Sequence, residues 1–141
     1  MLTDYKINVK LKLAALWTSL MFLYIYCDYF ELKTPGKIES LINLHTPVGE
    51  ATPKLLVIFS LIMIVPTLMI CLSALLRPKL NKWLNIAVAT ALSCISLLIL
   101  TGNLTNFDPW YLFYGLYQVV ELVVLGIIIY SAWRWPKVAI S

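Results

Sequence analysis

The sequence predicts an all-α polytopic membrane protein, a single domain over residues 1–141 in which four transmembrane helices form one bundle. Three observations predict this class: the composition, the spacing of the apolar residues and the placement of the basic ones. The chain is 61% hydrophobic and 13% charged, with a mean hydropathy of +0.85. A soluble domain of this length could not bury so much apolar surface.

Four apolar stretches account for this composition, at about residues 11–30, 55–76, 80–104 and 110–133. Each is close to the length of about 20 residues that spans the hydrocarbon core of a bilayer as a helix. Lipid offers no hydrogen-bond partner to an unpaired peptide group, so a spanning segment must be a helix or a strand of a closed barrel. The alternating pattern of barrel strands is absent from the sequence, and helices are therefore expected.

The basic residues predict the orientation. Loops rich in Lys and Arg are retained in the cytoplasm, which indicates an N-in, C-in topology. Of the eleven Lys and Arg residues, three would face outward, namely Lys33, Lys37 and Lys54. The other eight flank the inner ends of the spans: Lys6, Lys10, Lys12, Arg77, Lys79, Lys82, Arg134 and Lys137. The net charge of +4 is thereby explained by topology, and a nucleic-acid partner is not expected.

The longest connection, residues 31–53, should lie on the outer side and contain a short amphipathic helix. The run Thr34-Pro35-Gly36 can start this helix, and its apolar residues Ile38, Leu41 and Ile42 follow at i, i+3 and i+4. We expect it to lie flat on the membrane and to end near residues 45–47. Such a helix could cap the bundle or act as a lid over a cavity.

Glu121 is the polar residue placed most deeply in a span. It lies about eleven residues beyond Trp110 and about as far before Trp133, which at about 1.5 Å per residue is close to the bilayer midplane. An ionised carboxylate at this depth costs several kcal/mol, so Glu121 should be protonated, paired or solvated by a cavity.

Two helical faces carry the remaining polar and aromatic residues. At 100° per residue, one stripe of the fourth span holds Trp110, Tyr114, Tyr117, Gln118 and Glu121, and one stripe of the first span holds Trp17, Met21, Tyr24, Asp28 and Glu31. If these stripes face each other, they enclose a pocket that opens outward between the first and fourth helices. The predicted ligand-binding residues are Glu121, Asp28, Tyr24, Tyr114, Tyr117, Gln118 and Trp17. Pro66 should kink the second span beside this pocket.

No catalytic or cofactor motif is visible in the sequence. Cys27, Cys71 and Cys94 are spaced singly, and the one histidine, His45, lies in the outer connection. Metal-ligand spacings, nucleophile motifs, phosphate loops and dinucleotide fingerprints are lacking. The sequence therefore predicts no metal, no cofactor and no catalytic residue.

Three runs carry a resemblance to known sequences: KLKLAALW from Lys10 to Trp17, YIYCDYF from Tyr24 to Phe30, and PGK from Pro35 to Lys37. With them the chain resembles a family of small bacterial four-helix membrane proteins of unknown function, over nearly its whole length. The resemblance implies the cytoplasmic membrane of a bacterium and implies no activity. A looser similarity, at the level of fold, links the chain to the emopamil-binding and sigma-2 receptor superfamily and to the small multidrug transporters, but those transporters carry their membrane Glu in the first helix.

Three hypotheses of function follow. The chain could bind, and transport, a small lipophilic or cationic ligand at Glu121. It could instead be a structural or accessory subunit whose polar stripes are satisfied inside the bundle, or an intramembrane enzyme that uses Glu121 or Asp28 as acid or base. The two stripes could also face a twin subunit, so a homodimer is an alternative to a closed single bundle.

Overall fold

The structure is a computed structural model that describes residues 7–46, 49–105 and 108–136. Its elements are, in chain order, α1 (Val9–Glu31), α2 (Lys37–Ile42), β1 (His45–Thr46), β2 (Gly49–Glu50), α3 (Pro53–Leu75), α4 (Pro78–Thr105), the 3-10 helix η1 (Pro109–Tyr111) and α5 (Leu112–Trp133). The predicted spans agree with the observed helices to within two residues at every end. The all-α bundle is therefore confirmed. Two residues named above, Lys6 and Lys137, lie outside the described residues.

Side-chain caps set the starts of the helices. Asn8 precedes α1, Thr52 precedes α3 and Asp108 precedes η1, and each side-chain oxygen accepts a hydrogen bond from a backbone N–H two or three residues further on. Pro53 and Pro109 then occupy the first helical position, where a missing N–H costs nothing. The helices thus begin where the sequence supplies a cap, at the edges of the apolar stretches.

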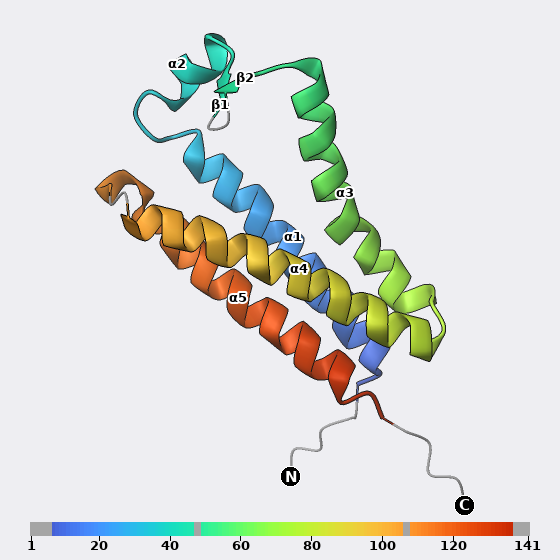
Figure 1. Cartoon of the computed structure of the whole chain (residues 1–141). Helices are drawn as coiled ribbons and strands as arrows, with labels where there is room; N and C mark the ends of the chain where they lie inside the picture. The colour runs from blue at the N-terminus through green and yellow to red at the C-terminus, as the bar shows by residue number, and fades with distance from the viewer. Residues whose placement is uncertain (1–6, 47–48, 106–107, 137–141) are drawn as a thin grey trace, which may run out of the picture.

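The four long helices form a ring in which one side is thin (Figure 1). α1 packs against α3 and α5, and α4 packs along α5, whereas α3 and α4 share few contacts. Figure 1 shows α3 and α4 meeting at their short connection and α3 leaning away toward the end that carries α2. Pro66 lies inside α3 and is buried. The bundle is therefore closed at one end and more open at the other.

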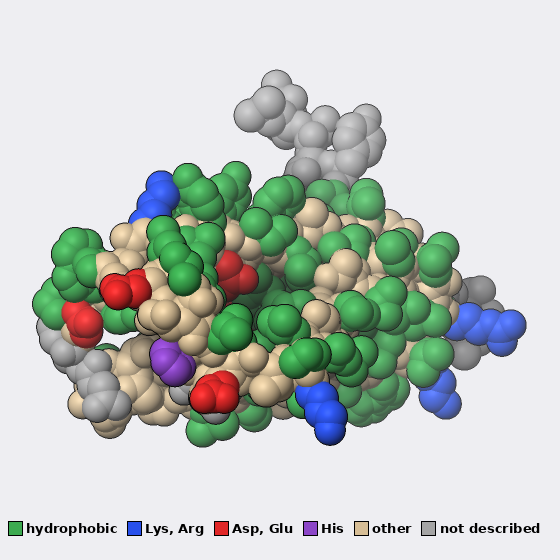
Figure 2. Space-filling view, turned by 90° about the horizontal axis from the view of Figure 1, so that it is seen from above, with side chains coloured by type: hydrophobic (Ala, Val, Ile, Leu, Met, Phe, Trp, Pro, Cys, Tyr) green, Lys and Arg blue, Asp and Glu red, His purple; other side chains and the backbone are tan. Residues whose placement is uncertain are grey.

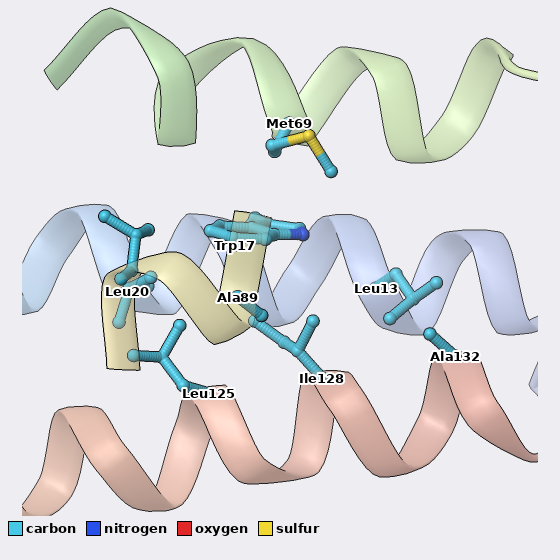
Figure 3. Close-up of a cluster of buried hydrophobic side chains, with 9 residues drawn as sticks. Leu13, Trp17, Leu20, Met69, Ala89, Leu125, Ile128 and Ala132 are labelled. Carbon is cyan, nitrogen blue, oxygen red and sulfur yellow. The ribbon is translucent and has the colours of Figure 1, made fainter. Parts of the chain in front are cut away.

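The hydrophobic core occupies the closed half (Figure 3). Its side chains come from all four long helices and point toward one another: Leu13, Trp17 and Leu20 of α1, Met69 of α3, Ala89 and Leu92 of α4, and Leu125, Ile128 and Ala132 of α5. Outside this core the long helices expose large apolar side chains over most of their length. Such surfaces are stable in lipid and not in water.

All four long helices are long and apolar enough to cross a membrane. Together with the exposed apolar faces, this identifies the chain as a polytopic membrane protein. Tryptophans mark the closed end, where Trp83 and Trp133 pack edge to face, and tyrosines and phenylalanines gather near the other end. This arrangement is typical of side chains at the two membrane interfaces.

The outer connection contains the expected short helix and an unexpected pair of strands. Gly36 turns the chain into α2 with a φ of 77°, and Ile38 and Ile42 are exposed on that helix. After α2, β1 and β2 pair as antiparallel strands, with His45 opposite Glu50. The predicted helix is thus shorter than expected and is followed by a two-residue ladder, because the backbone turns at Leu44, which has a φ of 56°.

Candidate functional site

The bundle buries a polar pair on α5. Gln118 and Glu121 lie one turn apart on the face that carries the core residues Leu125 and Ile128 further along the helix. Glu121 is 7% exposed and Gln118 is 6% exposed. The apolar stripe of α5 therefore changes to a polar one without leaving the interior of the bundle.

Two neighbouring helices hold this pair. The Tyr24 hydroxyl of α1 donates to Glu121 Oε1 at 2.8 Å, and the Ser96 hydroxyl of α4 donates to Gln118 Oε1 at 2.6 Å. The Ser96 hydroxyl also lies beside the Glu121 carboxyl group, and in the described part of the chain the Gln118 amide nitrogen makes no hydrogen bond to the protein. The pair therefore has hydrogen-bonding capacity beyond the two hydrogen bonds from Tyr24 and Ser96.

Gln118 and Glu121 both line a cavity of about 150 Å³. All four long helices line it, with Leu23, Tyr24, Cys27 and Asp28 of α1, Ile62 and Met63 of α3, Leu92, Ile95, Ser96 and Ile99 of α4, and Tyr114, Tyr117, Gln118 and Glu121 of α5. A view onto the molecule from the side of α2 and α3 shows a hollow among hydrophobic side chains with an acidic side chain at its edge (Figure 2). The cavity lies beyond the core, in the half of the bundle where α3 leans away.

The open end of the bundle is tied to the outer connection by an ion pair. Lys37 at the start of α2 forms an ion pair with Glu31 at the end of α1. The second carboxyl oxygen of Glu31 accepts a hydrogen bond of 3.1 Å from the Tyr114 hydroxyl, and Thr34, which is buried, donates to the Glu31 backbone carbonyl at 2.7 Å. We call these four residues, Glu31, Thr34, Lys37 and Tyr114, the outer latch. Tyr114 belongs both to the latch and to the wall of the cavity.

The charged side chains in the described lining of the cavity are all acidic. The lining contains two carboxyl groups, Glu121 and Asp28, and no Lys, Arg or His among the described residues. Asp28 is exposed and forms neither a side-chain hydrogen bond nor an ion pair with the described part of the chain. A positive charge that enters the cavity would therefore meet carboxyl groups and no basic side chain in the described lining.

Comparison with known proteins places the chain in a family. A model of the family of unknown function DUF6326 matches residues 2–141. The chain belongs to this family. Neither the curated proteins nor the solved structures include a match.

The structure brings together six of the seven residues that the sequence suggested as ligand-binding. Tyr24, Asp28, Tyr114, Tyr117, Gln118 and Glu121 of this DUF6326 protein all line the cavity. The pocket was expected between the first and fourth spans, which are α1 and α5. The cavity is lined by these two helices and also by α3 and α4. Whether these residues bind a ligand stays a prediction.

Trp17, the seventh residue, does not line the cavity. Its side chain is fully buried in the core, and its indole Nε1–H donates to Asn85 Oδ1 of α4 at 2.6 Å. The stripe of α1 does face inward, but at the depth of Trp17 the helices are packed together and leave no space. Its position fits a packing role in this DUF6326 protein.

Sequence reasoning missed several polar residues of the interior. Ser96 was not among the predicted site residues, although its hydroxyl donates a hydrogen bond to Gln118. Asn81 and Asn85 were not predicted as interior residues, yet both are fully buried. Matching depths could have found Asn85, since it lies about as far from the start of α4 as Trp17 lies from the start of α1. In the described residues no three His, Cys, Asp or Glu side chains are grouped so that they could hold a metal ion.

Proposed function

We propose that this DUF6326 protein binds a small lipophilic or cationic molecule in the cavity between its four long helices, as a binding protein or transporter of the bacterial cytoplasmic membrane. Both ends of the chain would lie in the cytoplasm, and the cavity would open toward the outside. The basic residues support this orientation, because those described at the closed end include Lys10, Lys12, Arg77, Lys79, Lys82 and Arg134.

One observation carries the proposal: a carboxyl group in the middle of a membrane helix is hydrogen-bonded by Tyr24 and at the same time lines a cavity. Polar groups inside a membrane are costly and are retained where they pair or act. If Glu121 served packing alone, a bundle of this kind would be expected to satisfy both oxygens and to leave no space beside them. The cavity beside the Glu121 carboxyl group supports a binding role.

The accessory-subunit hypothesis has an observation in its favour as well. The hydrogen bonds from Tyr24 to Glu121 and from Ser96 to Gln118 join α1 and α4 to α5, and such bonds between membrane helices each contribute about 0.6 kcal/mol to stability. In a purely structural role, Glu121 and Gln118 would serve to hold the helices together through these hydrogen bonds. The two functions therefore differ in whether Glu121 and Gln118 also bind a molecule in the cavity that they line.

Substitutions at Glu121 separate the two functions. Glu121→Gln keeps the shape and a hydrogen-bond acceptor for Tyr24, so the thermal unfolding temperature in detergent should change little, while stabilisation by a screened small molecule should be lost. Glu121→Leu strands the Tyr24 hydroxyl and should lower stability by about 1–3 kcal/mol. Glu39→Gln, which removes an exposed carboxylate of α2, is the matched control and should change neither.

A second pair of variants checks that the cavity is the binding site. Leu92→Phe and Ile99→Phe each enlarge a side chain of the cavity wall and should abolish stabilisation by the same molecules. Stabilisation that survives Glu121→Gln and both wall variants would remove the cavity from the account of function. In that case the accessory-subunit role would be favoured.

A further inference from the structure

The charge of the cavity limits the kind of ligand that it can take. Glu121 and Asp28 are the charged residues among its described lining, and Lys37, at the open end, is already paired with Glu31. A ligand that carries a negative charge would bring it beside two carboxyl groups in a medium of low dielectric constant. A ligand that carries a positive charge would relieve the cost of burying Glu121.

The walls of the cavity suit a cation with an apolar body. Apart from the polar pair, Ser96 and Asp28, the lining consists of aliphatic, aromatic and sulfur-containing side chains. Three of these are tyrosines, Tyr24, Tyr114 and Tyr117, and the face of an aromatic ring attracts a nearby ammonium group by about 0.5–2 kcal/mol. The polar end of a ligand would thus meet Glu121, and its apolar end would meet Leu23, Ile62 and Ile95.

The size of the cavity sets an upper limit on the ligand. Ligand pockets for drug-sized molecules usually measure about 300–1,000 Å³. This cavity measures about 150 Å³, and an apolar cavity of about that volume in another protein holds benzene. A molecule with several aromatic rings would not fit without a movement of α3 or α4.

We propose that the preferred ligand is a compact organic ammonium ion, a primary or secondary amine no larger than a singly substituted benzene ring, with its ammonium group on the carboxylate of Glu121. This inference rests on the proposed function and specifies its ligand class. It assigns Asp28, which is exposed at the cavity and forms no ion pair with a described residue, to the attraction of the incoming cation.

Four probes of graded charge and size test the inference. Benzylamine, benzyl alcohol and benzoate share one ring and differ in charge, and triphenylmethylamine carries the same ammonium group on three rings. Binding to the full chain in lipid nanodiscs would be measured by calorimetry near neutral pH, with empty nanodiscs to correct for partition into lipid. Benzylamine should bind about tenfold or more tightly than benzyl alcohol, because an ammonium adds a charge-assisted hydrogen bond. Benzoate and triphenylmethylamine should not bind.

Variants attribute the preference to particular carboxyl groups. Glu121→Gln should reduce the ratio of the two affinities, amine over alcohol, to near one, whereas the matched control Glu39→Gln should preserve it. Asp28→Asn should slow association of benzylamine, with an effect that shrinks as salt is added, because steering by an exposed charge is screened.

The outcomes distinguish the inference from the proposed function beneath it. If benzyl alcohol binds as tightly as benzylamine and Leu92→Phe removes both, the cavity is a binding site and the ammonium inference is wrong. The same conclusion follows if benzoate or triphenylmethylamine binds at that site, or if Glu121→Gln preserves the preference. If none of the four probes binds the unmodified chain, the inference fails, and the broader screen with Glu121→Gln then decides the proposed function alone.

Discussion

At the scale of single residues, the closed half of the bundle is organised by a buried amide. Asn85 of α4 accepts hydrogen bonds at its Oδ1 from Trp17 Nε1 at 2.6 Å and from the Ser73 hydroxyl at 3.1 Å. Its amide nitrogen donates to the Oδ1 atom of Asn81 at 2.6 Å and to the Asn81 carbonyl at 2.9 Å, and Asn81 in turn donates to the Ser73 carbonyl at 2.6 Å. Because these groups come from α1, α3 and α4, the network fixes the relative depth of three helices.

Asn85→Leu should therefore destabilise the bundle. Leucine has a similar volume but leaves the indole N–H of Trp17 and the hydroxyl of Ser73 buried without an acceptor, at a cost of about 1–3 kcal/mol. The free energy of unfolding would be measured by denaturant titration in mixed micelles. Asn43→Leu, at an exposed position after α2, is the control and should stay within about 0.5 kcal/mol of the unmodified chain. Equal stability of the two variants would show that the network is dispensable.

The contrast between Glu121 and Trp17 shows what a helical stripe can predict at this scale. Both lie on inward faces, as the spacing of 100° per residue indicates, and the midplane position of Glu121 followed from counting residues to the flanking tryptophans. The same counting does not say where space is left between helices, because that depends on the side chains of three other helices. Trp17 consequently faces inward as predicted and meets Asn85 in the core, outside the cavity.

At the scale of elements, the outer latch fixes the short helix α2 to the bundle. The side chains of Lys37 and Glu31 are 16% and 17% exposed, so their ion pair is sheltered from solvent, and Thr34 and Tyr114 bond to Glu31 from two further positions. α2 itself buries no residue, and its apolar side chains are free to lie against lipid. The latch rather than packing therefore determines where α2 sits.

Lys37→Met should loosen this connection while the long helices remain intact. Methionine keeps the unbranched stem and the helical propensity but removes the charge, so the opening free energy of residues 32–44 should fall by about 1 kcal/mol. Hydrogen exchange measured by mass spectrometry should then speed up about fivefold in that segment. Lys33→Met removes an ammonium group that lies 4.4 Å from the ring centre of Tyr29 and pairs with no carboxylate of the described residues, so it should have a smaller effect. A larger effect at Lys33 would contradict the role of the latch.

Elements of different length differ in how well the sequence predicts them. Each long helix corresponds to an apolar stretch of about twenty residues, so its bounds follow closely from hydropathy. Prolines and side-chain caps also mark three of the helix starts. The strands β1 and β2 have two residues each, which is too short for an alternating pattern to be visible. The ladder depends on the backbone turn at Leu44, and nothing in the residue types indicates that turn.

At the scale of the whole molecule, the ring of helices explains why a cavity exists at all. α3 is anchored to the others through Met69, Ser73 and Pro66 in its second half, and no residue of its first half is buried. The core and the Asn85 network close one end of the bundle, and α3 leans away at the other (Figure 1). The same asymmetry places acidic side chains at the open end and most of the basic ones at the closed end.

This charge asymmetry predicts the orientation of the molecule in the membrane. If the closed end faces the cytoplasm, a cysteine at Glu39 of α2 should react with a membrane-impermeant maleimide in intact cells, and a cysteine at Lys79, at the start of α4, should not. Both positions are exposed in the structure and lie in helices at opposite ends of the bundle (Figure 1), so neither Glu39→Cys nor Lys79→Cys should disturb packing. The parent chain for both variants should have Cys27, Cys71 and Cys94 replaced by alanine.

Permeabilised cells provide the control for this experiment. Once the membrane is opened, both cysteines should react, which shows that the thiol at residue 79 is protected by the bilayer and not by the fold. Labelling of residue 79 alone in intact cells would show that the molecule has the opposite orientation in the membrane. The cavity, Asp28 and the outer latch would then face the cytoplasm, and any ligand of Glu121 would have to enter from inside the cell, because α2 and the open end of the bundle lie on the same side as Asp28.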